Sequence, residues 1–143
     1  MALPSHLSLE IVTPDRSVAY ETVDEVELPG AEGYLGVLPG HTPLLVALQV
    51  GAVRFRKGDE ETFLSVAFGF AEIAPDRVRI LADVAERAEE IDIRRAEAAV
   101  ERARERLAQA VEVDFERARI ALLKSMARLQ VASRARVRGS AGL

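Results

Sequence analysis

The sequence has no cysteine and no tryptophan, and aromatic residues make up only 5% of its 143 positions. The lack of cysteine excludes disulfides, thiolate metal sites and cysteine nucleophiles. The scarcity of aromatic residues argues against single-stranded nucleic acid as a ligand, because such sites use aromatic side chains as stacking platforms. No apolar run approaches the roughly 20 residues of a membrane-spanning helix. The first six residues lack the basic and apolar segments of a secretory signal. We therefore expect a soluble, cytosolic protein that reaches a membrane only through a partner.

Residues that carry chemistry are also few. The two histidines, His6 and His41, do not form a pair with metal-ligand spacing. The glycines between residues 30 and 40 are not followed by the Gly-Lys-Ser/Thr step of a phosphate-binding loop. No serine lies in the context of a nucleophile elbow. We predict that the chain is not an enzyme and has no catalytic residue, no metal site and no required cofactor.

Charge is distributed unevenly along the chain. Residues 1–85 carry 13 acids and 6 bases, whereas residues 115–143 carry one acid and seven bases. A cationic arm of this kind favours an anionic partner, such as nucleic acid, lipid headgroups or an acidic protein surface. Apolar residues make up 49% of the sequence, enough for a packed core.

The first 85 residues have the pattern of short β-strands. Residues 7–11, 52–56 and 77–80 alternate apolar and polar side chains, as half-buried strands do. The nearly continuous apolar run over residues 64–73 predicts a strand buried on both faces, with Gly69 where another backbone approaches closely. Many short strands without an intervening helical pattern predict an all-β sandwich or barrel.

After residue 85 the apolar residues recur at three- and four-residue steps, which predicts two amphipathic helices joined by a short connection. Asp92 is the expected N-cap of the first helix and Asp114 that of the second. The tail from residue 136 is expected to be frayed. The apolar stripes consist of Ala96, Val100, Ala103, Leu107 and Val111 in the first helix, and of Phe115, Ala118, Leu122, Met126 or Ser125, Leu129 and Ala132 in the second. Because such alanine-rich stripes bury little apolar area, we expect the hairpin to be a movable element.

The second helix also has apolar residues outside its main stripe. They are Ile120, Leu123, Ala127 and Val131. This surface is wider than one neighbouring helix would cover, so we expect a second docking partner for the helix.

Two segments allow a structural and a functional interpretation. Residues 33–44 combine glycines, prolines and large apolar side chains, which suits either a packed sandwich corner or an exposed contact loop. Residues 86–96 are either a capped, charged helix start or a small polar pocket, in which Arg95 binds a phosphate and acids accept hydrogen bonds from a base or ribose.

Several motifs together resemble the epsilon subunit family of bacterial F-type ATP synthases. The resemblance covers roughly residues 7–132, and it rests on segments that follow the family's order: residues 7–15, 35–44, 68–73 and 85–88. It implies a β-sandwich of about ten strands over residues 1–85. An antiparallel two-helix hairpin with a basic tail would follow over residues 86–143.

The resemblance implies a non-catalytic subunit of the central stalk, or rotor, that couples the catalytic head of the proton-translocating synthase to the c-ring. The implied partners are the gamma subunit, the c-ring and the catalytic beta subunit, with no nucleic acid. The implied location is peripheral, on the cytoplasmic face of the bacterial inner membrane. The residues expected to contact the c-ring or gamma are Gly33, Tyr34, Leu35, Leu38 and His41. Many family members carry an acid at the position of Tyr34.

The family's hairpin either folds against the sandwich or extends along gamma, and the extended form inhibits ATP hydrolysis. Some bacterial members bind ATP at the folded hairpin through a motif of Ile or Leu, Asp, any two residues, Arg and Ala, which residues 91–96 match. ATP is then a regulatory ligand. The candidate ATP-binding residues are Glu86, Ile91, Asp92, Arg95, Ala96, Lys124 and Arg128. Lys124 stands where nucleotide-binding members have arginine, and a lysine does not make the bidentate phosphate contact of an arginine.

The second helix carries cations at helical spacing, so several share one flank. The resemblance supplies an acidic helical stretch of the beta subunit as their partner. The candidate residues for this contact are Arg117, Lys124, Arg128 and Arg134. The rival hypothesis is a stand-alone ligand-binding or nucleic-acid-binding β-domain with a basic arm. The acidic sandwich and the low aromatic content argue against this rival.

Overall fold

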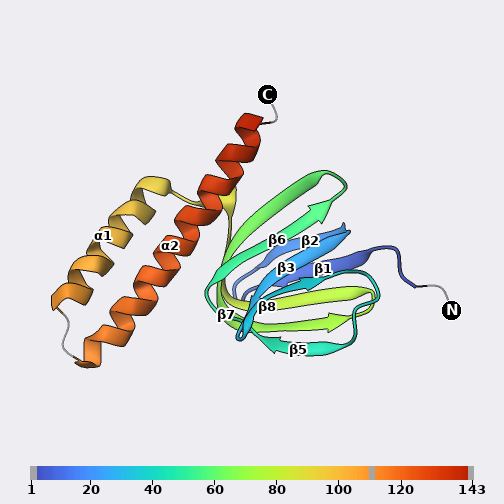
Figure 1. Cartoon of the computed structure of the whole chain (residues 1–143), viewed down its shortest axis with the longest axis horizontal. Coiled ribbons are helices and arrows are strands. Elements are labelled where there is room, and N and C mark those ends of the chain that lie inside the picture. Colours follow the sequence, from blue (N-terminus) through green and yellow to red (C-terminus); the bar gives the residue numbers. More distant parts are fainter. Residues whose placement is uncertain (1–2, 110–111, 142–143) are drawn as a thin grey trace.

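The computed structural model describes residues 3–109 and 112–141, with side chains described over residues 3–109 and 115–134. Within these ranges, a β-sandwich of eight strands precedes one 3-10 turn and two antiparallel helices (Figure 1). The elements are β1 (Leu7–Val12), β2 (Ser17–Val23), β3 (Glu25–Gly30), β4 (Gly33–Val37), β5 (Leu44–Ala47), β6 (Gly51–Lys57), β7 (Glu60–Ala74), β8 (Arg77–Arg87), η1 (Ala88–Glu90), α1 (Ile93–Gln109) and α2 (Glu112–Ala141). The predicted fold class, a β-sandwich followed by a helical hairpin, is confirmed.

The sandwich is one continuous sheet that folds over on itself. The strand order is β2-β1-β8-β7-β6-β3-β4, and β5 adds to β7. The first half of β7 pairs with β6, whereas its second half pairs with β5. The first half of β8 pairs with β1 in parallel orientation. The structure thus has eight continuous strands, compared with the about ten that the resemblance implies, and β7 changes its neighbour from β6 to β5 along its length.

β7 bends sharply at Phe68 and Gly69. Phe68 has φ 58° and Gly69 has φ 111°, and both values lie in the region that favours glycine. A Cβ at Gly69 would lie 2.0 Å from the carbonyl oxygen of Leu81 on β8. The expected close backbone approach at Gly69 is therefore confirmed. It occurs at the bend where β7 crosses from one layer of the sandwich to the other.

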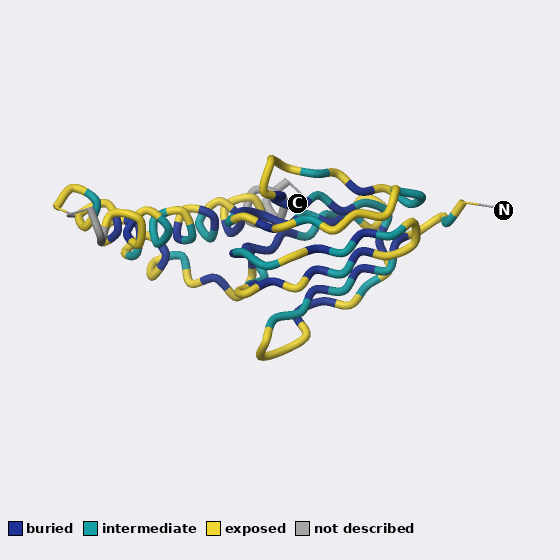
Figure 2. The backbone as a smooth tube through the Cα atoms, turned by 90° about the horizontal axis from the view of Figure 1, so that it is seen from below, coloured by how far each residue is buried: buried dark blue, intermediate teal, exposed yellow. Residues whose placement is uncertain are grey.

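Alternating side chains from both layers form one apolar core. Leu9 and Ile11 of β1 and Phe55 of β6 are among its fully buried members. Figure 2 shows buried and more exposed positions alternating along the strands, as expected for strands with one buried face. In β7, residues 63–67 are all buried. The prediction of burial on both faces thus holds for this half of the strand, because α2 contacts its outer side, and it is wrong for the second half, where Phe70 is exposed.

The hairpin packs on the sandwich through α2, and α1 packs on α2 (Figure 1). A small second cluster joins the two parts through Phe63 of β7, Ile91, Ala96 of α1 and Val131 of α2. Its other members are mostly alanines, so this contact buries much less apolar area than the sandwich core. The packing agrees with a hairpin that is weakly held.

The helix boundaries and stripes differ in part from the prediction. The N-cap expected at Asp114 is wrong, because α2 begins at Glu112. Of the two alternatives on the stripe of α2, Ser125 is buried and Met126 is exposed. Phe115 is also exposed, whereas Ala127 and Val131, expected outside the main stripe, are buried. The position of Val111 lies outside the described residues, and α2 continues through most of the tail expected to fray.

The second docking partner expected for α2 is the chain's own sandwich. α2 contacts α1 on one side and β6, β7 and η1 on the other. α2 therefore has two buried faces, one against α1 and one against the sandwich, which explains why its apolar residues do not form a single narrow stripe. The domain boundary expected after residue 85 falls inside β8, which extends to Arg87.

Candidate functional site

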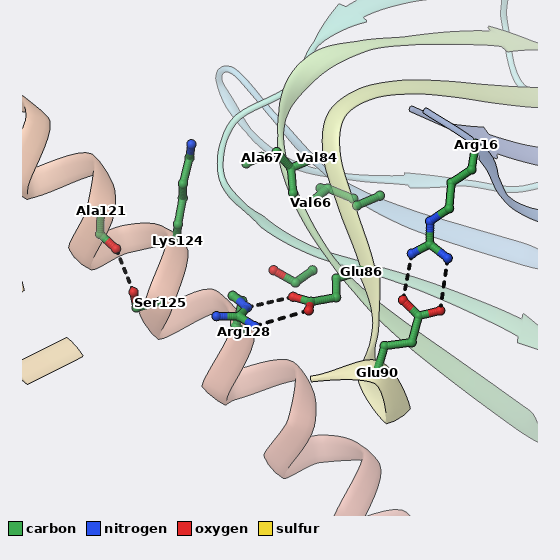
Figure 3. A pocket seen from close by; sticks show the side chains of 12 residues that line it. Arg16, Val66, Ala67, Val84, Glu86, Glu90, Ala121, Lys124, Ser125 and Arg128 are labelled. Carbon is green, nitrogen blue, oxygen red and sulfur yellow. Dashed lines mark hydrogen bonds and ion pairs between the residues drawn. The ribbon is translucent and has the colours of Figure 1, made fainter. Parts of the chain in front are cut away.

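A cleft of about 550 Å³ lies between α2 and the sandwich. Its apolar floor comes from β7 and β8, and its charged side chains come from four different segments (Figure 3). The lining residues are Arg16, Ser65, Val66, Ala67, Val84, Ala85, Glu86, Glu90, Ala121, Lys124, Ser125 and Arg128. This volume falls within the range of about 300–1,000 Å³ that is usual for small-molecule sites.

Glu86 and Arg128 face each other across this cleft. Arg128 of α2 donates from Nε to Oε1 of Glu86 at 2.6 Å and from Nη2 to Oε2 at 3.2 Å. Both side chains are about 70% buried, with exposed fractions of 26% for Glu86 and 30% for Arg128. A bidentate pair of this kind fixes both orientation and distance. It joins α2 to the end of β8, so two of the predicted ATP-binding residues are brought together.

Lys124 lies one helical turn before Arg128 and contacts the bend in β7. Its Nζ is 5.7 Å from the centroid of the Phe68 ring, which is within the range of a cation–π interaction. Among the described residues, no carboxylate forms an ion pair with Lys124. Its ammonium group is therefore available to an anion that enters the cleft.

Arg16 and Glu90 form a second bidentate pair at the same cleft, and the sequence did not predict it. Arg16, in the turn between β1 and β2, donates from Nη2 to Oε2 of Glu90 at 2.7 Å and from Nη1 to Oε1 at 3.4 Å. The hydrogen bond from Arg16 lowers the pKa of the Glu90 carboxyl group, and partial desolvation opposes this effect. The two residues are 74 positions apart and belong to no local motif, so no sequence signal could have paired them.

Residues 91–96, which match the family's ATP-binding motif, lie beside the cleft but do not line it. Asp92 caps α1, because its Oδ1 accepts a hydrogen bond from the backbone N–H of Arg95 at 3.2 Å. This confirms the predicted N-cap. Ile91 and Ala96 are buried in the cluster that joins the hairpin to the sandwich, and the Arg95 side chain is exposed. The structure thus brings Glu86, Lys124 and Arg128 together and leaves Asp92 and Arg95 outside the lining.

The loop expected to contact the c-ring and gamma forms a groove of its own. A depression of about 520 Å³ is lined by residues 30–35 and 44–47, among them Gly33, Tyr34 and Leu35. The Tyr34 hydroxyl accepts a hydrogen bond from the backbone N–H of Ala52 at 3.1 Å, which holds the ring in place. Leu35 packs against the sandwich core.

Leu38 and His41 do not line this groove. Leu38 is 56% exposed. His41 is half-buried, and its Nδ1 lies 2.6 Å from the carbonyl oxygen of Thr42. Within this segment, some side chains therefore pack into the sandwich corner and others face solvent.

The cations expected to contact the beta subunit are largely directed at the sandwich in this structure. Lys124 lies over Phe68, Arg128 binds Glu86, and the guanidinium of Arg134 lies 5.8 Å from the centroid of the Phe63 ring. Arg117 is exposed on α2. Three of the four side chains would have to leave the sandwich before they could bind another protein.

Within the part of the chain that the structure describes, no group of three or more His, Asp or Glu residues has the geometry of a metal site. No helix in this part is both long enough and apolar enough to cross a membrane.

Comparison with known proteins gives consistent results over nearly the whole chain. Residues 6–88 match the family model of the ATP synthase delta/epsilon chain β-sandwich domain, and residues 89–133 match that of its long α-helix domain. The chain is 50% identical to the ATP synthase epsilon chain of Solibacter usitatus over 133 residues, which is 92% of this chain and 99% of that protein. It is 49% identical to the corresponding chain of Syntrophobacter fumaroxidans, over 90% of this chain and 96% of the relative.

Solved structures show the same architecture. A chain in the cryo-EM structure of the Euglena gracilis mitochondrial ATP synthase (OSCP/F1/c-ring) has a TM-score of 0.82 and 26% identity, over 92% of this chain and 84% of that one. A chain from the central stalk and c-ring of the Tetrahymena thermophila mitochondrial ATP synthase has a TM-score of 0.53 and 12% identity, over 94% of this chain and 98% of that one. At that identity the second likeness concerns the fold alone.

Proposed function

This chain belongs to the ATP synthase delta/epsilon chain family, and on that premise we propose that it is a non-catalytic central-stalk subunit of a proton-translocating ATP synthase. The observation that carries the proposal is the match of both family models, in order, across residues 6–133. The likeness to a chain in an F1/c-ring assembly supports the same role. The chain would contribute to ATP synthesis and proton transport by coupling parts of the complex.

The proposed partners are the gamma subunit, the c-ring and the catalytic beta subunit. The groove beside Gly33, Tyr34 and Leu35 and the exposed Leu38, which directly follows β4, support a contact with gamma or the c-ring. Exposed apolar side chains on a rigid sandwich suit protein docking. The chain would then be peripheral on the cytoplasmic face of a bacterial inner membrane, attached through the complex.

Copurification tests the stalk role. The tagged full-length chain, expressed with the other synthase subunits, should retain gamma and the c-ring. A Leu38→Asp variant should retain less of both, because a carboxylate would be desolvated in the contact. Recovery of the chain as a monomer bound to nucleic acid would instead support a basic-armed binding domain.

We further propose that the hairpin regulates the enzyme and that ATP is a regulatory ligand of its folded form. The cleft between α2 and the sandwich exists only while the hairpin is folded, because α2 supplies Lys124 and Arg128. A ligand that binds one of two conformations shifts the population toward that conformation. ATP in the cleft would therefore hold the hairpin on the sandwich.

Release of the hairpin would expose a cationic surface. Lys124, Arg128 and Arg134 would leave their partners on β7 and β8, and together with Arg117 they would form one basic flank. An acidic stretch of the beta subunit is the proposed acceptor, and this contact would inhibit ATP hydrolysis. Because the flank would be partly exposed, the attraction should weaken as the salt concentration rises.

Removal of α2 tests the regulatory role. In the assembled enzyme, a chain that ends at residue 113 should leave ATP hydrolysis faster than the full-length chain does. The difference should shrink at high salt, and the amounts of gamma and c-ring retained should stay the same. Equal hydrolysis with both chains at low and high salt would contradict regulation by α2.

A further inference from the structure

The cleft has a charged rim on each of two sides, and only one of them belongs to the hairpin. Figure 3 shows Arg128 and Lys124 projecting from α2, and Arg16 reaching in from the turn between β1 and β2. All three cations line the same cleft. The sandwich thus supplies a guanidinium from a segment that is far in sequence from residues 91–96.

The two arginines at the cleft are held in similar ways. Glu86 binds Arg128 and Glu90 binds Arg16, in both cases through two hydrogen bonds. Each carboxylate occupies the fork of a guanidinium, and this fork also binds phosphate in a bidentate manner. Half of the Arg16 side chain is exposed, as is 35% of Glu90, so this pair opens to solvent more readily than Glu86 and Arg128.

We propose that Arg16 is a phosphate-binding residue of this cleft and that Glu90 competes with the ligand for it. This inference rests on the proposed ATP binding and extends it. The polyphosphate of a nucleotide would lie between Lys124 and Arg128 on α2 and Arg16 on the sandwich. Arg16 would exchange the Glu90 carboxylate for a phosphate oxygen. A ligand held from both sides would fix α2 to the sandwich more firmly than one bound by the hairpin alone.

We expect Arg16→Ala and Glu90→Gln to change the affinity for ATP in opposite directions. Both variants break the same ion pair, so a purely structural role of the pair predicts similar effects. If Arg16 binds phosphate, it contributes to the affinity for ATP. Arg16→Ala should then weaken ATP binding about tenfold, as expected for the loss of a charge-assisted hydrogen bond. Glu90→Gln frees Arg16 and should tighten binding by about threefold or more.

The experiment is calorimetric titration of ATP into the full-length chain and its variants. Arg77→Ala and Glu60→Gln make the same charge changes at exposed positions outside the cleft lining and serve as controls. Both controls should bind ATP like the parent chain. Inorganic tripolyphosphate in place of ATP should show the same order of variants, because the contact is to phosphate.

Two kinds of result would overturn the proposal, and they have different meanings. If the parent chain binds ATP and Arg16→Ala binds it equally well, the role of Arg16 is wrong while ATP binding stands. The role of Arg16 is also wrong if both variants weaken binding alike. If the parent chain binds no ATP, the proposed regulatory ligand and the role of Arg16 fall together.

Discussion

Gly69 occupies a position in β7 that accepts no side chain. A Cβ there would lie 2.0 Å from the Leu81 carbonyl oxygen and 2.8 Å from the Ala82 Cα. The φ of Gly69, 111°, is also unfavourable for residues with a side chain. We expect Gly69→Ala to lower the free energy of unfolding by about 3 kcal/mol or more. Urea unfolding of the full-length chain measures this change.

Gly36 provides the matched control for this prediction. It lies in β4, a Cβ at this position would meet no atom within 4 Å, and its φ is not in the left-handed region. Gly36→Ala should therefore change the free energy of unfolding by less than about 0.5 kcal/mol. Equal effects of the two substitutions would contradict a specific clash between β7 and β8.

The Glu25 carboxylate makes the stability of the sandwich depend on pH. It accepts hydrogen bonds from Arg54 at 3.0 Å and Arg56 at 3.3 Å, and the bond from Arg54 is the largest cause of the lowered pKa of Glu25. Because the pKa of Glu25 is lower in the folded state than its usual value of 4.5, the ionised carboxylate stabilises the fold at pH values above 4.5. This stability is lost as the pH falls below 4.5 and through the folded-state pKa.

The difference in stability between the parent chain and Glu25→Gln should therefore depend on pH. The parent should be the more stable of the two at about pH 7, and its advantage should shrink steadily below pH 4.5. Urea unfolding between about pH 7 and pH 3 measures the difference, with Glu97→Gln on the exposed face of α1 as control. An advantage that stays constant over this range would mean that the Glu25 carboxylate is not held by these arginines.

Individual residues differ in how far the sequence could predict them. The cap at Asp92 and the close approach at Gly69 follow from local rules, so the sequence predicts both. The pair of Arg16 and Glu90 depends on how a turn of the sandwich meets the 3-10 segment, which no spacing in the sequence encodes. The left-handed φ of Phe68 is not predictable for a related reason, because only the bend of β7 imposes it.

At the scale of elements, α2 is the helix that the sandwich holds. Its attachment combines a small alanine-rich cluster with the ion pair of Glu86 and Arg128. We expect Arg128→Ala to speed amide hydrogen exchange in α1 and α2 while the protected amides of the sandwich keep their rates. A double-mutant cycle with Glu86→Ala should give a coupling of about 1 kcal/mol.

Arg119→Ala is the control on the same helix. Arg119 binds Glu116 within α2 and is exposed, so its loss should leave hairpin exchange unchanged. If Arg128→Ala and Arg119→Ala had the same effect on exchange, the contact between α2 and β8 would not be what holds the hairpin.

The elements are predictable where one environment decides the pattern. The strands alternate because each has one buried face, and the hairpin follows from apolar steps of three and four. The stripe of α2 is only partly predictable. α2 packs against α1 and β7 at once, so the buried set shifts from Met126 to Ser125 and includes Val131. The parallel pairing of β1 with β8 joins segments far apart in the sequence, and no local signal specifies it.

At the scale of the whole molecule, two surfaces take part in the proposed function. The groove beside Tyr34 lies in the sandwich and is formed by β3, β4 and β5. The cleft with Glu86, Lys124 and Arg128 lies under the hairpin. While the hairpin is folded, the Glu86–Arg128 ion pair and the contacts of Lys124 with Phe68 and of Arg134 with Phe63 join α2 to the sandwich. In the proposed function, a rigid docking part is thereby combined with a weakly held part whose position a bound nucleotide would bias.

In the proposed role, this chain couples the catalytic head of the synthase to the proton-driven rotor. The most direct test is ATP synthesis driven by a proton gradient, in vesicles that contain the enzyme depleted of this chain or supplemented with it. We expect synthesis to require the chain, and we expect the depleted enzyme to hydrolyse ATP without pumping protons. Equal synthesis and equal pumping in both preparations would contradict the stalk role.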